Sequence, residues 1–252
     1  MQKYFLLLIL ICQSSFSKVS IPYQIGSSSV VINYYNKGTD YNFIHLHNNE
    51  TTSLQAGLKT LKICNASLIS LEHSGKRNIE FLLNNKKYCF DPNRIYTDKG
   101  IAKTLTSCSH YNKQAAQLIK KFADKVLSLI KNKQPIIALH NNKYYSIKNY
   151  YPRMNMAKDA KRFYKNPNQN FRNFYFVTHD SDYKLFKKLG FNVVLQNNKS
   201  VTDDGSLSVA LADQEYFNVE SGYNKLSQQV NMISTICRNK EYLWQIKRSD
   251  LK

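Results

Sequence analysis

The sequence predicts an α/β protein with a mixed, mostly parallel central sheet flanked by helices. Three observations predict this class. Short apolar runs at residues 41–47, 136–140 and 216–220 alternate with amphipathic stretches of helical period. Gly, Pro, Asn and Asp cluster between these runs, as they do in turns. Strands that alternate with helices along the chain are typical of α/β layer folds.

Residues 1–17 have the pattern of an export signal. Lys3 is followed by an apolar segment at residues 5–12 and by small residues before Lys18. The apolar segment is too short to span a bilayer. We therefore expect cleavage near Ser17, a periplasmic or secreted protein without stable membrane insertion, and a single domain over residues 18–252.

The first half of this domain alternates strand and helix patterns. Residues 30–35 and 41–47 predict strands around a turn at residues 36–38. Residues 51–62 predict a helix capped by Thr51 or Thr52, because leucines recur at helical spacing. Residues 66–72 and 78–83 predict two more strands, and Pro92 places residues 91–94 in a loop. Residues 112–131 have the clearest helical pattern.

The alternation continues in the second half. Strands are predicted at residues 136–140, 174–177, 192–196 and 216–220, and helices at residues 182–189, 206–212 and 224–236. Gly190 is expected to end the first of these helices. His47, His140 and Glu220 each lie at the predicted carboxyl end of a strand. Ligands gather at such strand ends in α/β sheets, so we group these three residues.

The formal net charge of +19 is strongly basic, and its Lys and Arg residues are spread along the chain. No motif typical of nucleic-acid binding accompanies them, so we expect no nucleic acid partner. A basic surface facing an anionic envelope, or a pocket for acidic substrates, fits an exported protein better.

After cleavage four cysteines remain: Cys64, Cys89, Cys108 and Cys237. None has zinc-finger spacing. The sequence leaves open buried thiols, one disulfide or two disulfides, with three possible pairings of all four.

The pair His47-x-x-Glu50 is the central candidate for a metal site. An imidazole and a carboxylate three residues apart, on the turn that leaves a strand, can bind one cation. His140 would be a third ligand and would leave the fourth position open for water, as catalytic zinc requires. The alternative is a surface turn whose Glu lies at a helix N-terminus. His45 is a competing ligand, which we expect to be packed or solvated instead.

Asn93 and Arg94 follow in the loop at residues 91–94. Their amide and planar guanidinium are suited to a carboxylate or a developing oxyanion. The alternative is an ordinary turn with an exposed arginine. A second metal site around His179, among neighbouring acids, is less favoured than a loop that leads into a helix.

The order of these motifs resembles the zinc carboxypeptidase superfamily, and is most similar to its succinylglutamate desuccinylase and aspartoacylase branch. The resemblance covers about residues 30–229. It consists of His-x-x-Glu, Asp-x-Asn-Arg-x-aromatic, a strand that ends in His, and Val-Glu near the C-terminus. It implies that His47, Glu50 and His140 bind one Zn²⁺ ion.

The resemblance also implies roles for other residues. Asn93 and Arg94 would bind a substrate carboxylate, and Arg77 is a candidate for a further arginine at the oxyanion. Glu220 would be the catalytic carboxylate, with Glu215 as a nearby rival. Apart from the resemblance, residues 203–206 predict a turn, with the alternative that Asp203 and Asp204 line the mouth of the cleft, and residues 141–142 and 144–146, which follow His140, are expected to shape the substrate pocket.

The implied activity is metal-assisted hydrolysis of an amide bond. For an exported protein, we expect a carboxypeptidase acting on cell-wall-type or other peptides with a free carboxylate. Two alternatives remain. One is a deacylase of small N-acyl amino acids. The other is a non-catalytic protein of the same fold that binds an envelope component.

Overall fold

The computed structural model describes residues 17–131 and 134–239. The predicted signal peptide therefore lies outside the described residues, except for Ser17, which begins the first strand.

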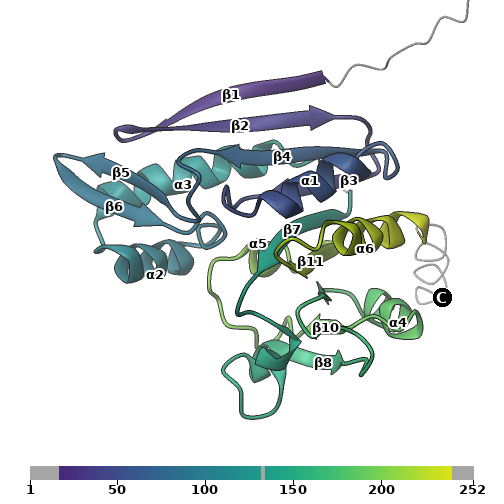
Figure 1. Ribbon diagram of the computed structural model, residues 1–252. Helices are drawn as coiled ribbons and strands as arrows, with labels where there is room; N and C mark the ends of the chain where they lie inside the picture. The colour runs from purple at the N-terminus through teal and green to yellow at the C-terminus, as the bar shows by residue number, and fades with distance from the viewer. Residues whose placement is uncertain (1–16, 132–133, 240–252) are drawn as a thin grey trace, which may run out of the picture.

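Among the described residues, nine strands form one sheet in the order β1-β2-β4-β3-β7-β11-β9-β10-β8 (Figure 1). The strands of this sheet are β1 Ser17–Ile25, β2 Ser28–Asn36, β3 Tyr41–His45, β4 Ala66–Glu72, β7 Ile136–Asn142, β8 Ala160–Tyr164, β9 Phe174–Val177, β10 Val193–Gln196 and β11 Tyr216–Gly222. A separate hairpin pairs β5 Ile79–Leu83 with β6 Lys86–Phe90.

The predicted α/β class and the mixed sheet are confirmed. The adjacent strands β4, β3, β7 and β11 run parallel. The prediction of a mostly parallel sheet is not confirmed. Four of the eight neighbouring pairs in the described sheet are antiparallel, as is the β5–β6 hairpin. Part of the reason is local, since only Gly26 and Ser27 separate β1 from β2. A connection of two residues can join only antiparallel strands.

Helices cover both faces of the sheet (Figure 1). The described helices are α1 Thr51–Thr60, α2 Asp98–Cys108, α3 Lys113–Ser128, α4 Asp180–Lys188, α5 Leu207–Ala210, α6 Leu226–Arg238 and the 3₁₀ helices η1 Ile147–Tyr150 and η2 Ala157–Asp159. Helices α1, α4 and α6 pack on one face with Leu139 of β7, and α3 packs on the other with Ala138. Because strand residues alternate between faces, His140 lies on the same face as Ala138. No described helix is both long and apolar enough to cross a membrane.

The start of α1 differs from the prediction. Glu50, rather than Thr51 or Thr52, occupies the N-cap position, and its side chain makes no capping hydrogen bond. The carboxylate is directed instead to His140, 3.1 Å away. Helix α3 begins as its pattern predicts, because the side chain of Asn112 accepts a hydrogen bond from the Ala115 N–H.

Two disulfides resolve the cysteine alternatives. Cys64, beyond the end of α1, is bonded to Cys237 in α6. Cys89 in β6 is bonded to Cys108 at the end of α2. The first bond joins segments 173 residues apart and so connects the two halves of the described chain.

Replacing Cys64 and Cys237 together with Ala should lower the free energy of unfolding by about 2–5 kcal/mol, because the bond closes a long loop in the unfolded chain. Urea denaturation followed by circular dichroism measures this change. The matched control is the Cys89→Ala, Cys108→Ala variant. Its missing bond joins residues only 19 positions apart, so its free energy of unfolding should fall by less. A larger loss in the control would contradict the loop-length explanation.

Candidate metal-binding and catalytic site

The three predicted ligand residues lie together. His47, Glu50 and His140 are buried, and each offers a ligand atom within 4.8 Å of the other two. His47 Nδ1 is 3.0 Å from Glu50 Oε1 and 3.3 Å from His140 Nδ1. His140 Nδ1 is 3.1 Å from Glu50 Oε2. Such spacings fit donors around a single ion with ligand bonds of about 2 Å.

Neighbouring parallel strands bring these residues together. His47 follows β3, and the Glu50 N–H donates to the His47 carbonyl at 2.9 Å, which closes the turn before α1. His140 lies in β7, the strand beside β3. Two strand ends at one edge of the sheet therefore supply all three donors.

Asp91 orients His47 from behind. His47 Nε2 lies 2.7 Å from Asp91 Oδ1. An ionised carboxylate can only accept a hydrogen bond, so Nε2 carries a proton and Nδ1 faces the other ligands. Sequence reasoning placed Asp91 in the loop motif but did not assign it this role. Its position at the start of Asp-x-Asn-Arg is the signal that could have suggested it.

Opposite charges stabilise the ionised forms of this cluster. Burial alone lowers the pKa of His47, but the carboxylates of Asp91 and Glu50 outweigh it and raise the pKa to about 9. Burial alone raises the pKa of Glu50, but His47 and His140 outweigh it and hold that pKa well below its ordinary value. The buried carboxylate is therefore available as an anionic ligand.

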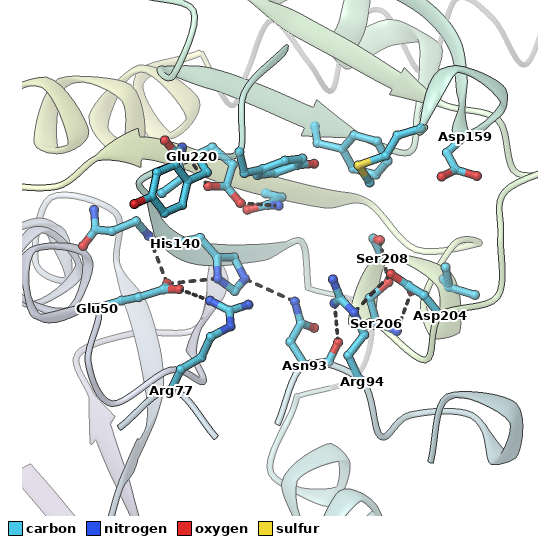
Figure 2. A pocket seen from close by; sticks show the side chains of 18 of the residues that line it. Glu50, Arg77, Asn93, Arg94, His140, Asp159, Asp204, Ser206, Ser208 and Glu220 are labelled. Atoms are coloured by element: carbon cyan, nitrogen blue, oxygen red, sulfur yellow. Dashed lines mark hydrogen bonds and ion pairs between the residues drawn. The ribbon is translucent and has the colours of Figure 1, made fainter. Parts of the chain in front are cut away.

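Arg77 bridges the carboxylates of Glu50 and Asp91, and its contact with Glu50 is drawn in Figure 2. Its Nη1 donates to Glu50 Oε1 at 2.8 Å, and its Nε donates to Asp91 Oδ2 at 3.1 Å. The side chain is 45% exposed, so its guanidinium also reaches solvent. The structure thus brings the predicted Arg77 to the site.

A hydrogen-bonded chain fixes the other oxygen of Glu50. Oε2 accepts from the Asn141 N–H at 2.9 Å. The side chain of Asn141 accepts from the Ser53 N–H and donates to Gln229 Oε1, and Gln229 Nε2 donates to the His140 carbonyl. Sequence reasoning missed Gln229, because a glutamine on an amphipathic helix carries no local signal of its partner.

Glu220 lies beside His140 on the adjacent strand. The two residues are opposite each other in the parallel β7–β11 pair, so their side chains project from the same face. Asn142 Nδ2 donates to Glu220 Oε2 at 3.0 Å, and Asn218 Nδ2 donates to Oε1 at 3.2 Å. Burial raises the pKa of Glu220. The rival Glu215 precedes β11 and does not line the pocket described below.

Asn93 and Arg94 are also brought to the site. Asn93 Nδ2 lies 3.5 Å from His140 Nε2, and Asn93 Oδ1 accepts from the Leu207 N–H. Arg94 Nε lies 3.3 Å from Asp204 Oδ2, and Arg94 Nη1 donates to the Asn93 carbonyl. Asp204 therefore lies beside the predicted carboxylate-binding pair.

One pocket of about 550 Å³ is lined by six of the predicted site residues, Glu50, Arg77, Asn93, Arg94, His140 and Glu220, but not by His47 or Asp91 (Figure 2). Its wall also includes Asn142 and Tyr145, as expected from their position after His140. The volume lies within the usual range for a small-molecule or peptide site.

The competing histidine sites are not favoured. His45 is buried between Ser70 Oγ and the Glu50 carbonyl, as expected for a packed side chain. His179 is the N-cap residue of α4, and Asp180 begins that helix. In the part of the chain that the structure describes, the metal-capable cluster is the one formed by His47, Glu50 and His140.

No protein-family model matches the chain, and no curated protein sequence matches it. The interpretation of the site therefore depends on its geometry and on the order of its motifs.

The protein should bind about one equivalent of a divalent ion such as Zn²⁺, and His47→Ala should reduce that affinity by at least about 100-fold, because one of three ligands is lost. Calorimetry of chelator-treated protein measures both values. His110→Ala, which removes an exposed histidine outside the pocket, is the matched control and should bind like the parent. Equal affinity in parent and His47→Ala would exclude this cluster as the metal site.

Metal affinity should rise with pH. Protonated His47 cannot offer Nδ1 to a metal, and its pKa is raised to about 9. Each unit of pH below that value should therefore change the affinity about tenfold, through release of one proton, and the slope should vanish above it. Competition with a chelator of known pH dependence, between about pH 6 and 8, measures the slope. An affinity independent of pH in this interval would contradict the raised pKa.

Proposed function

We propose that the protein is an exported, zinc-dependent amide-bond hydrolase that acts as a carboxypeptidase on cell-wall-type or other peptides with a free carboxylate. The observation that carries this proposal is the meeting of His47, Glu50 and His140 at the wall of the pocket that the buried carboxylate of Glu220 also lines.

The donor set fits zinc. Two imidazole nitrogens and one carboxylate are the protein ligands of many catalytic zinc sites, and Asp91 supplies the hydrogen bond that such histidines require. When bound, zinc supplies a Lewis acid that polarises the scissile carbonyl and lowers the pKa of the attacking water. The relation to zinc carboxypeptidases is supported by the parallel strands β3, β7 and β11, whose carboxyl ends carry or lead into the predicted ligands and Glu220.

Glu220 is proposed as the general base and acid. Its carboxylate accepts the proton of the attacking water and returns it to the leaving amine. Burial raises its pKa, so the carboxylate is a better base than an exposed one. Asn142 and Asn218 each hold one of its oxygens and so fix its orientation toward the pocket.

Arg94 and Arg77 have separate proposed tasks. Arg94, with Asn93, binds the free carboxylate of the substrate, since a guanidinium and an amide match two carboxylate oxygens. Arg77 lies against Glu50 and offsets negative charge that develops on the scissile carbonyl oxygen. The pair therefore positions the peptide and stabilises its transition state.

The extracellular or periplasmic location is supported by the two disulfides, which persist in oxidising compartments. The export pattern of residues 1–17 points the same way. Peptides of the cell wall have both amide bonds and free carboxylates, which makes them substrates of the required chemistry.

Glu220→Gln should lower kcat on such peptides by about 10²–10⁴-fold while zinc still binds, because the base is lost but the ligands remain. The assay incubates zinc-loaded protein with wall peptides and, in parallel, with N-acyl amino acids. Release of a terminal amino acid from the peptides alone supports the carboxypeptidase, and cleavage of the acyl substrates alone supports the deacylase.

Glu215→Gln is the matched control, because it removes the rival carboxylate outside the pocket and should keep the parent's rate. Equal kcat for Glu220→Gln and the parent would overturn the assigned base. Bound zinc with no cleavage of either substrate class would favour a non-catalytic binding protein.

A further inference from the structure

Asp159 forms the end of the pocket that is far from the metal ligands. It lies at the end of η2, before β8, and its side chain is directed toward the pocket on the opposite side from Glu50 and His140 (Figure 2). The side chain is only 7% exposed.

One oxygen of this carboxylate accepts hydrogen bonds from the protein, and the other accepts none among the described residues. Oδ1 accepts from Thr202 N and Thr202 Oγ1, each at 2.8 Å. Within residues 17–131 and 134–239, Oδ2 accepts no hydrogen bond and no Lys, Arg or His forms an ion pair with Asp159. Asp204, the other aspartate on the pocket wall, already pairs with Arg94.

A carboxylate that is largely withdrawn from solvent, with one oxygen open to a pocket, interacts strongly with a cationic group that enters the pocket. The chain has 36 Lys and Arg residues, so cations are abundant. The pocket nevertheless leaves Asp159 without one. A ligand in the pocket can therefore supply a cationic partner for Asp159.

The pocket wall also offers apolar side chains that suit an aliphatic stem. Met156, Phe176 and Val209 line the same cavity as Arg94 and Asp159, together with Tyr150. An amino acid whose carboxylate meets Arg94 could extend its methylene groups along these side chains, and a terminal ammonium would then reach Asp159.

We propose that Asp159 forms a specificity subsite for the side-chain ammonium of a diamino acid, such as a lysine-like residue, at the carboxylate end of the substrate. The assignment of Arg94 to the substrate carboxylate rests on the proposed function. The subsite itself rests on the burial and the open oxygen of Asp159.

The alternative is that Asp159 only accepts the two hydrogen bonds of Thr202. Asp159→Asn separates these roles, because the amide keeps an acceptor oxygen for Thr202 and loses the charge. The matched control is Asp213→Asn, which removes one exposed carboxylate outside the pocket.

The test compares two probes by calorimetry on the purified protein, as isolated. Nα-acetyl-L-lysine carries the ammonium, and Nα-acetyl-L-2-aminoheptanoate has a methyl group in its place. The parent and Asp213→Asn should prefer the lysine probe by about tenfold or more, as a charge-assisted hydrogen bond predicts. Asp159→Asn should lose most of that preference.

Equal binding of the two probes by the parent, no binding of either, or an undiminished preference in Asp159→Asn would each overturn the subsite. If Asp159→Asn does not fold, the parent's preference between the probes still decides the outcome. Peptide cleavage by zinc-loaded protein is assayed separately. A lysine preference without cleavage would support the subsite and contradict the proposed hydrolase. Cleavage without a lysine preference would support the hydrolase and contradict the subsite.

Discussion

The arrangement of the site depends on how the protein compensates the buried carboxylate of Glu50. Its Oε1 faces His47 and Arg77, and its Oε2 faces His140 and the Asn141 N–H. These partners come from the end of β3, the segment before β5 and strand β7. Loss of one partner of a buried charge typically costs about 3–5 kcal/mol. The same contacts that bring together a cluster able to hold a metal ion therefore also fix how these elements meet.

Much of the fold could be predicted, but not all of its strand directions. β4 and β9 have the predicted bounds, because dense apolar runs of that length belong to buried strands. β1 and β8 were not predicted. Residues 19–25 of β1 do alternate apolar and polar side chains, a strand signal that the prediction overlooked beside the export signal, whereas β8 is short and its residues are exposed or half-buried at the edge of the sheet. Both edge strands pair antiparallel, and their omission made the sheet look more parallel than it is.

The residues of the candidate site also differ in whether the sequence predicts them. His47, Glu50, His140 and Glu220 could be grouped because each follows or ends a predicted strand, and strand ends meet at one edge of a parallel sheet. Asp159 and Gln229 could not be grouped with them, because no pattern along the chain tells which pocket or backbone carbonyl a polar side chain will reach. Their importance follows from tertiary contacts alone.

The net charge of +19 and the buried carboxylates of the pocket act at different stages of binding. Salt screens exposed charges beyond about 8 Å, so the basic surface mainly governs encounter with anionic material. Inside the pocket, Glu220 and Asp159 are nearly excluded from solvent, where Coulomb interactions are stronger and less screened by salt. Under the proposed function, a peptide with several carboxylates and one side-chain ammonium suits both environments. The basic surface attracts a peptide whose net charge is negative. The pocket then selects a residue whose ammonium pairs with Asp159 and whose carboxylate pairs with Arg94. Affinity and selectivity would then depend on separate groups, so a change at Asp159 would alter which peptide is cleaved without changing how peptides reach the protein.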